Sequence, residues 1–83
     1  MMNIKAIDYI LKSIEICADA MGFSIDECAP YCEICGILAR VEIFHITPTY
    51  EERALVGDTL EMLCKAVALD YDTMVEVALQ RAK

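Results

Sequence analysis

Positive charge is scarce in this sequence, which has seven lysine and arginine residues against fourteen aspartate and glutamate residues and a formal net charge of −7. No basic cluster is present that could release counterions from a phosphate backbone, so direct nucleic-acid binding is not expected. The charge favours a protein partner with a basic surface. This protein would bind that surface, or compete for it with nucleic acid by acting as an acidic mimic.

Catalytic signatures are also missing. The single histidine, His45, has no nucleophile with a suitable base to accompany it. It extends an apolar helical face with Leu38 and Val41, which is typical of a hydrogen-bonded boundary residue. Asp70 and Asp72 are explained by helix capping. With neither a glycine-rich phosphate loop nor a Ser-His-Asp order, the sequence does not indicate an enzyme.

Long apolar runs are absent, because charged residues interrupt every stretch before the ~18 residues that a membrane span needs. The first ten residues lack the basic, apolar and small-residue regions of a secretory signal. An odd number of cysteines, five, then argues against a disulfide framework. We therefore expect a soluble cytoplasmic protein that does not bind membranes.

Apolar residues are abundant by contrast, at 58% of the 83 positions. A chain of this length makes one domain, which we place at residues 1–83. Such a domain buries only about 60–65% of the surface that its unfolded chain exposes. The surplus apolar surface predicts a homodimer or another protein-binding face.

The apolar residues recur at steps of three and four, which predicts a small all-α domain of four helices. The expected ranges are 3–21, 30–45, 50–69 and 73–82. Asn3 and Thr49 are expected as N-caps, Gly22 as a left-handed terminator, and Pro30 as the first residue of the second helix. The alternative is an α+β fold with a short strand at 41–47, where β-branched residues alternate with others.

Three expectations concern packing. The apolar arc of the first helix is wide, since Ile10 and Cys17 lie beyond its main stripe, and a second molecule is expected to cover this second side. Phe44 and His45 are placed on the inner face of the second helix. Gly57 is expected to permit a close helix crossing.

Cys28, Cys32 and Cys35 fall within eight positions and allow three interpretations. A zinc or Fe–S site needs a turn between Cys28 and Cys32, because a straight helix would hold Cys28 and Cys35 ~10 Å apart. A redox pair of Cys32 and Cys35 at a helix start is the second interpretation. The favoured one is that they are small buried hydrophobes. A fourth metal ligand would have to come from Cys17, Cys64 or His45.

The C-x3-C-x2-C spacing of these cysteines is also similar to the cluster-binding motif of the radical S-adenosylmethionine enzymes. That family usually has an aromatic residue before its last cysteine, where this chain has Ile34. The fold of that family is also a barrel, which is built from a chain of well over twice this length. The resemblance therefore carries no activity to this chain.

The sequence thus predicts a non-enzymatic, acidic protein-interaction module that binds or inhibits a partner through an apolar patch rimmed by carboxylates. Phage-type inhibitors and nucleic-acid mimics are small acidic proteins of this kind. The alternative is a small zinc or Fe–S protein that uses Cys28, Cys32 and Cys35.

Overall fold

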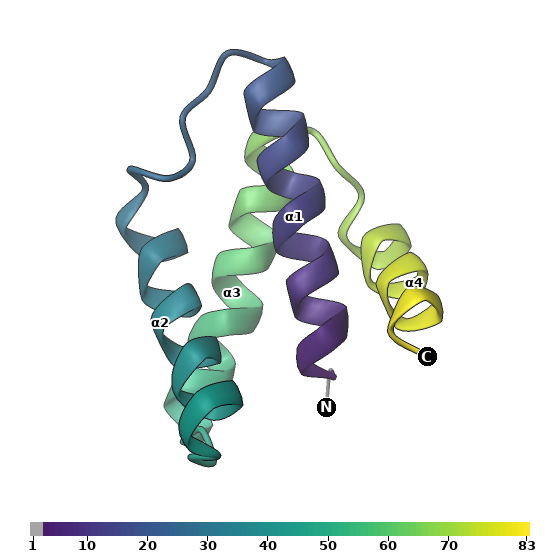
Figure 1. Ribbon diagram of the computed structural model, residues 1–83. Coiled ribbons are helices and arrows are strands. Elements are labelled where there is room, and N and C mark those ends of the chain that lie inside the picture. The colour runs from purple at the N-terminus through teal and green to yellow at the C-terminus, as the bar shows by residue number, and fades with distance from the viewer. Residues whose placement is uncertain (1–2) are drawn as a thin grey trace.

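The computed structural model describes residues 3–83, which form four helices. They are α1 (Ile4–Ala20), α2 (Ala29–Phe44), α3 (Tyr50–Ala66) and α4 (Tyr71–Ala82). Successive helices run in opposite directions along the chain (Figure 1). The predicted all-α four-helix fold is confirmed.

The alternative strand at 41–47 is wrong. Residues 41–44 form the last turn of α2, and residues 45–47 have no regular structure. Val41 follows Ile34 and Ile37 at helical spacing, and both of these are buried in the core. Packing of that helical face therefore overrides the β-propensity of the segment.

Capping side chains set the helix starts as predicted. Asn3 accepts a hydrogen bond from the backbone N–H of Lys5 at 2.8 Å. Thr49 and Glu52 form a reciprocal capping box, with the Glu52 N–H donating to Thr49 Oγ1 at 3.1 Å and the Thr49 N–H donating to Glu52 Oε1 at 3.0 Å. The Thr49 N–H lowers the pKa of Glu52, because it stabilises the carboxylate. Gly22 ends α1 at a φ of 76°.

Six of the eight helix boundaries differ from the prediction: both ends of α1 and of α2 by one residue, the end of α3 by three and the start of α4 by two. α2 starts one residue before Pro30, because a proline in the first turn removes no helical hydrogen bond. α3 ends at Ala66 instead of 69, since Ala68 adopts a left-handed φ of 57°. α4 starts two residues early, at Tyr71, after Asp70 as N-cap residue, whose carboxylate accepts a hydrogen bond from the Thr73 hydroxyl.

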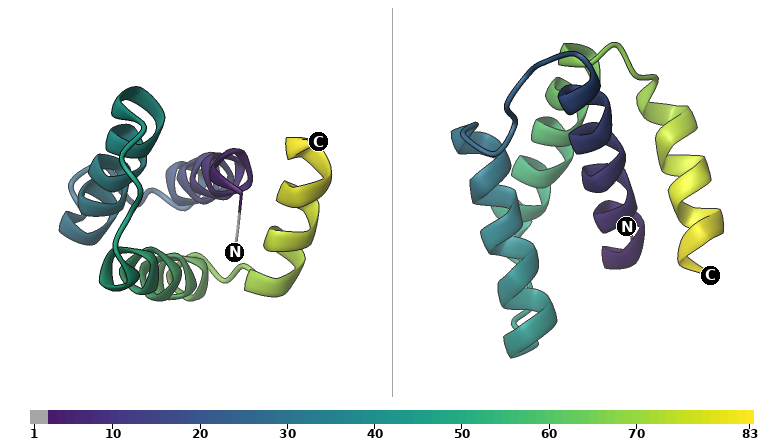
Figure 2. Two further views of the ribbon diagram at one scale, coloured as in Figure 1. Left: turned by 90° about the horizontal axis from the view of Figure 1, so that it is seen from below. Right: turned by 45° about the horizontal axis from the view of Figure 1, so that its top comes forward.

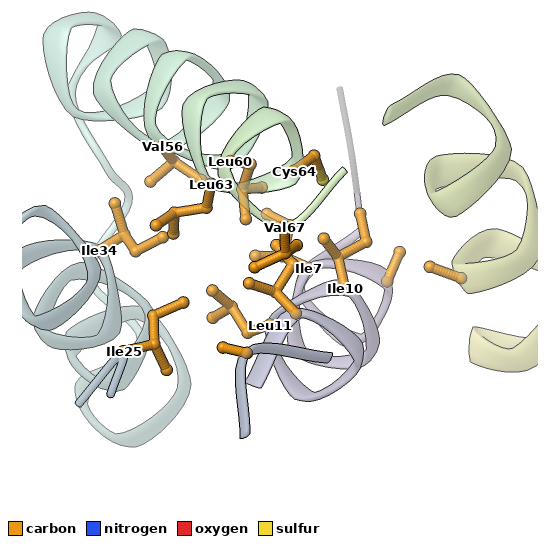
Figure 3. Close-up of a cluster of buried hydrophobic side chains, with 14 of the residues drawn as sticks. Ile7, Ile10, Leu11, Ile25, Ile34, Val56, Leu60, Leu63, Cys64 and Val67 are labelled. Atoms are coloured by element: carbon orange, nitrogen blue, oxygen red, sulfur yellow. The ribbon is translucent and has the colours of Figure 1, made fainter. Parts of the chain in front are cut away.

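The core lies between α1, α2 and α3 and extends to α4 (Figure 3). The core residues of α3 and its C-cap recur at helical spacing, and all five are buried: Val56, Leu60, Leu63, Cys64 and Val67. α1 contributes the fully buried Ile10 and Ile14, and the α1–α2 connection contributes Ile25. None of the four helices in the described part of the chain has both the length and the apolar character needed to cross a bilayer.

The second side of α1 is covered within the chain, which corrects one expectation. α1 packs against both α3 and α4, and it lies between α2 and α4 in the views of Figures 1 and 2. Ile10 is 0% exposed in the single chain, and Cys17 is half-buried. The wide apolar arc of α1 therefore needs no second molecule.

Two further packing expectations are wrong. Phe44 is 67% exposed and His45 is also exposed, because the α2–α3 end projects beyond the start of α1 (Figure 2). His45 instead ends α2 in the left-handed conformation, with a φ of 55°. At Gly57 a Cβ atom would meet no atom within 4 Å, so this glycine makes no close helix crossing.

Candidate functional site

The three clustered cysteines lie along the first turns of α2. Cys28 is the N-cap residue, and its carbonyl accepts a hydrogen bond from the Cys32 N–H at 3.1 Å. Cys28 itself has an extended backbone, with a φ of −77° and a ψ of 116°, and the helix that carries Cys32 and Cys35 begins at Ala29. Among residues 3–83, no three His, Cys, Asp or Glu side chains are grouped to hold a metal ion. Of the additional ligands considered from the sequence, His45 lies at the far end of α2, Cys64 is buried on α3, and Cys17 is half-buried on α1.

The thiols of this region have different surroundings. Cys32 is exposed, and its Sγ donates to the Asp26 carbonyl oxygen at 3.2 Å. Cys35 is half-buried, and burial raises its pKa, opposed in part by its interaction with the neighbouring Tyr31 hydroxyl. A raised pKa keeps the thiol protonated, and the protonated thiol is a poor nucleophile and metal ligand. This environment at Cys35 favours packing over redox chemistry.

Alkaline pH is expected to destabilise the fold through its buried thiols. Burial raises the pKa of Cys35 and of Cys64 above the ordinary value of 9.0. The protonated thiols contribute fully to the stability of the fold below about pH 9. This contribution is lost as the pH rises toward the pKa of the thiols in the folded state, because over that range the thiols ionise more readily in the unfolded chain. Urea titrations above pH 9 should show a steep fall in the free energy of unfolding.

The double variant Cys35→Ala/Cys64→Ala should show a shallower fall over the same alkaline range. Val67→Ala is the control, because it removes buried carbon without removing a proton. It should lower the stability at every pH and keep the steep alkaline fall. Equal alkaline slopes in the wild type and the double variant would contradict the assignment to these thiols.

A cation-free segment surrounds these cysteines. Residues 13–39 contain no lysine or arginine but five carboxylates, Glu15, Asp19, Asp26, Glu27 and Glu33. They lie on the last turns of α1, on the connection to α2 and on the start of α2, all in the upper part of the molecule as drawn in Figure 1. The α3–α4 connection, which carries Asp70, reaches the same end. We call the surface formed by the five carboxylates the acidic end.

Exposed apolar side chains lie among these carboxylates. Ile16 is 69% exposed, Met21 60% and Phe23 46%. The Phe23 N–H donates to the Ala18 carbonyl oxygen at 2.8 Å, so the connection leaves α1 in a defined direction. The Tyr31 hydroxyl donates to Glu15 Oε2 at 3.1 Å and ties α2 to α1. Burial, the Cys35 thiol and this carboxylate together raise the pKa of Tyr31, so its hydroxyl remains a donor.

A second exposed apolar surface lies at the opposite end of α2. Four side chains at the end of α2, in the α2–α3 connection and at the start of α3 are between 52% and 78% exposed, and we call them the apolar tip: Ile43, Phe44, Ile46 and Tyr50. Beside it is a groove of about 430 Å³, lined among others by Ile4, Ile37, Val41, Pro48 and Gly57. This surface was not predicted from the sequence. The available signal was that several apolar residues flank Pro48, at a helix boundary where the chain cannot continue as a helix and side chains are often exposed.

Comparisons with protein-family models, with curated proteins and with solved structures found no match to this chain. Its function is therefore inferred from the chemistry of its own surfaces.

Proposed function

We propose that this protein is a non-enzymatic interaction module that binds a basic partner protein through the acidic end. The observation that carries this proposal is the segment 13–39, which has five carboxylates and no cation. Lys65 is the cation on the last turn of α3, and its charge is already paired with Glu61 at 3.6 Å. It is therefore not paired with any of the five carboxylates of the acidic end. The carboxylates of the acidic end thus create a negative potential that attracts a basic surface.

The exposed apolar residues of the acidic end define the partner further. Ile16, Met21 and Phe23 offer aliphatic and aromatic contact area between the carboxylates. Interfaces combine such an apolar centre with a polar rim, and methionine and aromatic residues are enriched in them. The matching partner is an amphipathic segment with one apolar face and lysine or arginine at its edges.

Binding of this kind would inhibit a partner whose basic surface serves an acidic ligand. The module would occupy that surface in the manner of a nucleic-acid mimic, without contacting nucleic acid itself. We place it in the cytoplasm, where all five cysteines, which are free thiols, stay reduced. We also propose that it acts as a homodimer.

The alternative function, a small zinc or Fe–S protein, rests on the spacing of Cys28, Cys32 and Cys35. These thiols are exposed or half-buried, so an ion would reach them. Elemental analysis of protein purified without chelators decides this alternative. Stoichiometric zinc or iron would establish it, and the start of α2 would then have to rearrange to bring the sulfur atoms together.

Titration with a designed peptide tests the proposed function. The probe is a helical peptide with leucine on one face and lysine on the other, and the control replaces its lysines with glutamates. We expect binding of the lysine peptide alone, with an affinity that falls at least about tenfold between ~0.01 M and ~0.15 M salt, as the Debye length shrinks from ~30 Å to ~8 Å. Equal binding of the glutamate peptide, or no effect of salt, would contradict the proposal.

A further inference from the structure

The apolar tip and the groove form one continuous face. Val41 and Pro48 line the groove, and the exposed Phe44 and Ile46 lie between them in the sequence. The chain does not fill its own groove with Phe44, because that side chain is 67% exposed. The same face therefore carries an apolar projection and an apolar cavity.

We propose that this face is a self-association surface, in which the apolar tip of one chain enters the groove of a second copy. A twofold arrangement requires a patch that is complementary to itself, so that each copy both donates and accepts the same contact. A projection beside a cavity meets that requirement. The proposal does not depend on the acidic end or on its partner.

The distribution of charge favours a second copy at this face. Residues 38–57 carry two cations, Arg40 and Arg53, against three glutamates, and Arg40 pairs with Glu52. Two chains of net charge −7 repel each other over most of their surface, but this face is nearly neutral. Along α2 the nearest carboxylate of the acidic end, Glu33, is ten residues or ~15 Å from Ile43, which is about two Debye lengths at physiological salt.

The exposed area is sufficient for a specific dimer. If the ~200 Å² of an aromatic side chain is taken as an upper value for each of the four residues, the apolar tip exposes up to about 500 Å². A symmetric pair would therefore bury up to roughly 1,000 Å² from the tips alone, which is the threshold of a specific interface, and the groove walls would add to it. The groove, at about 430 Å³, also lies within the size range of binding cavities.

Two variants test the two halves of the contact. Phe44→Glu places a charge on an exposed tip residue, so the fold should tolerate it. Gly57→Leu fills the groove at a position where a Cβ atom meets nothing within 4 Å, and it replaces glycine with a better helix former. Ile16→Glu is the matched control, because Ile16 is 69% exposed but lies on the acidic end.

Sedimentation equilibrium at micromolar concentration is the measurement, with circular dichroism to verify that each variant is folded. We expect the wild type and Ile16→Glu to have twice the chain mass of 9.3 kDa. Phe44→Glu and Gly57→Leu should each raise the dimer dissociation constant by about 30-fold or more. The lysine peptide should still bind both variants, which separates this inference from the proposed function. A monomeric wild type, or a dimer that only Ile16→Glu disrupts, would overturn the inference.

Discussion

Replacing Leu63 with alanine is expected to lower the free energy of unfolding by about 2–5 kcal/mol. Leu63 is 2% exposed, and its side chain lies toward Ile34 of α2 (Figure 3). α2 packs chiefly against α3, so this contact is part of what attaches α2 to the other helices. A domain of 83 residues has a stability on the order of 4–12 kcal/mol. The expected loss is therefore a large fraction of the total stability.

Leu79→Ala is the matched control for this prediction, because Leu79 is 39% exposed on α4. It should cost less than about 1 kcal/mol. Both variants would be compared by urea denaturation at one protein concentration, since the stability of a dimer depends on concentration. Equal losses in the two variants would contradict the assignment of Leu63 to the core.

Neutralising three carboxylates of the acidic end should weaken binding of the lysine peptide by about tenfold or more. The variant is Asp26→Asn/Glu27→Gln/Glu33→Gln, and all three side chains are exposed. Exposed charge pairs contribute ~0.2–1 kcal/mol each, and 1.4 kcal/mol corresponds to a tenfold change in affinity. Glu15 is left in place, because it accepts the hydrogen bond from Tyr31. Fluorescence anisotropy at ~0.1 M salt, where the Debye length is ~10 Å, would measure the change.

The control for this variant changes the net charge by the same amount elsewhere on the surface. Glu42→Gln/Asp58→Asn/Glu76→Gln removes three exposed carboxylates outside the acidic end. It should weaken binding by less than about threefold, because charges farther than a Debye length from the contact are screened. If both triple variants lost affinity equally, only the net charge would matter and the acidic end would not be the binding surface.

Local sequence signals predicted most of the fold. Asn3, Gly22 and the Thr49 capping box each act through residues within four positions, so the sequence alone defines them. The helix ends that were missed depend on conformations without a strong local signal. Ala68 takes a left-handed φ that glycine would normally mark, and it ends α3 earlier than its periodicity indicates.

Exposure could not be predicted in the same way, because it depends on which helices face each other. The apolar arc of α1 indicated a second contact, but only the fold shows that α4 provides it. Phe44 continues a helical face that is buried at Ile34 and Ile37, yet it extends past the start of α1 and is exposed. The cysteine cluster likewise depends on the backbone at Cys28, which is extended and precedes the helix that carries Cys32 and Cys35.

Chemical-shift mapping of the lysine peptide on isotope-labelled protein tests the central claim most directly, because it reports where the partner binds. We predict that the perturbed amides lie in residues 15–35, around Ile16 and Phe23. The amides of the apolar tip should not shift. Perturbations confined to residues 43–50, or none at saturating peptide, would contradict the claim that the acidic end binds a basic partner.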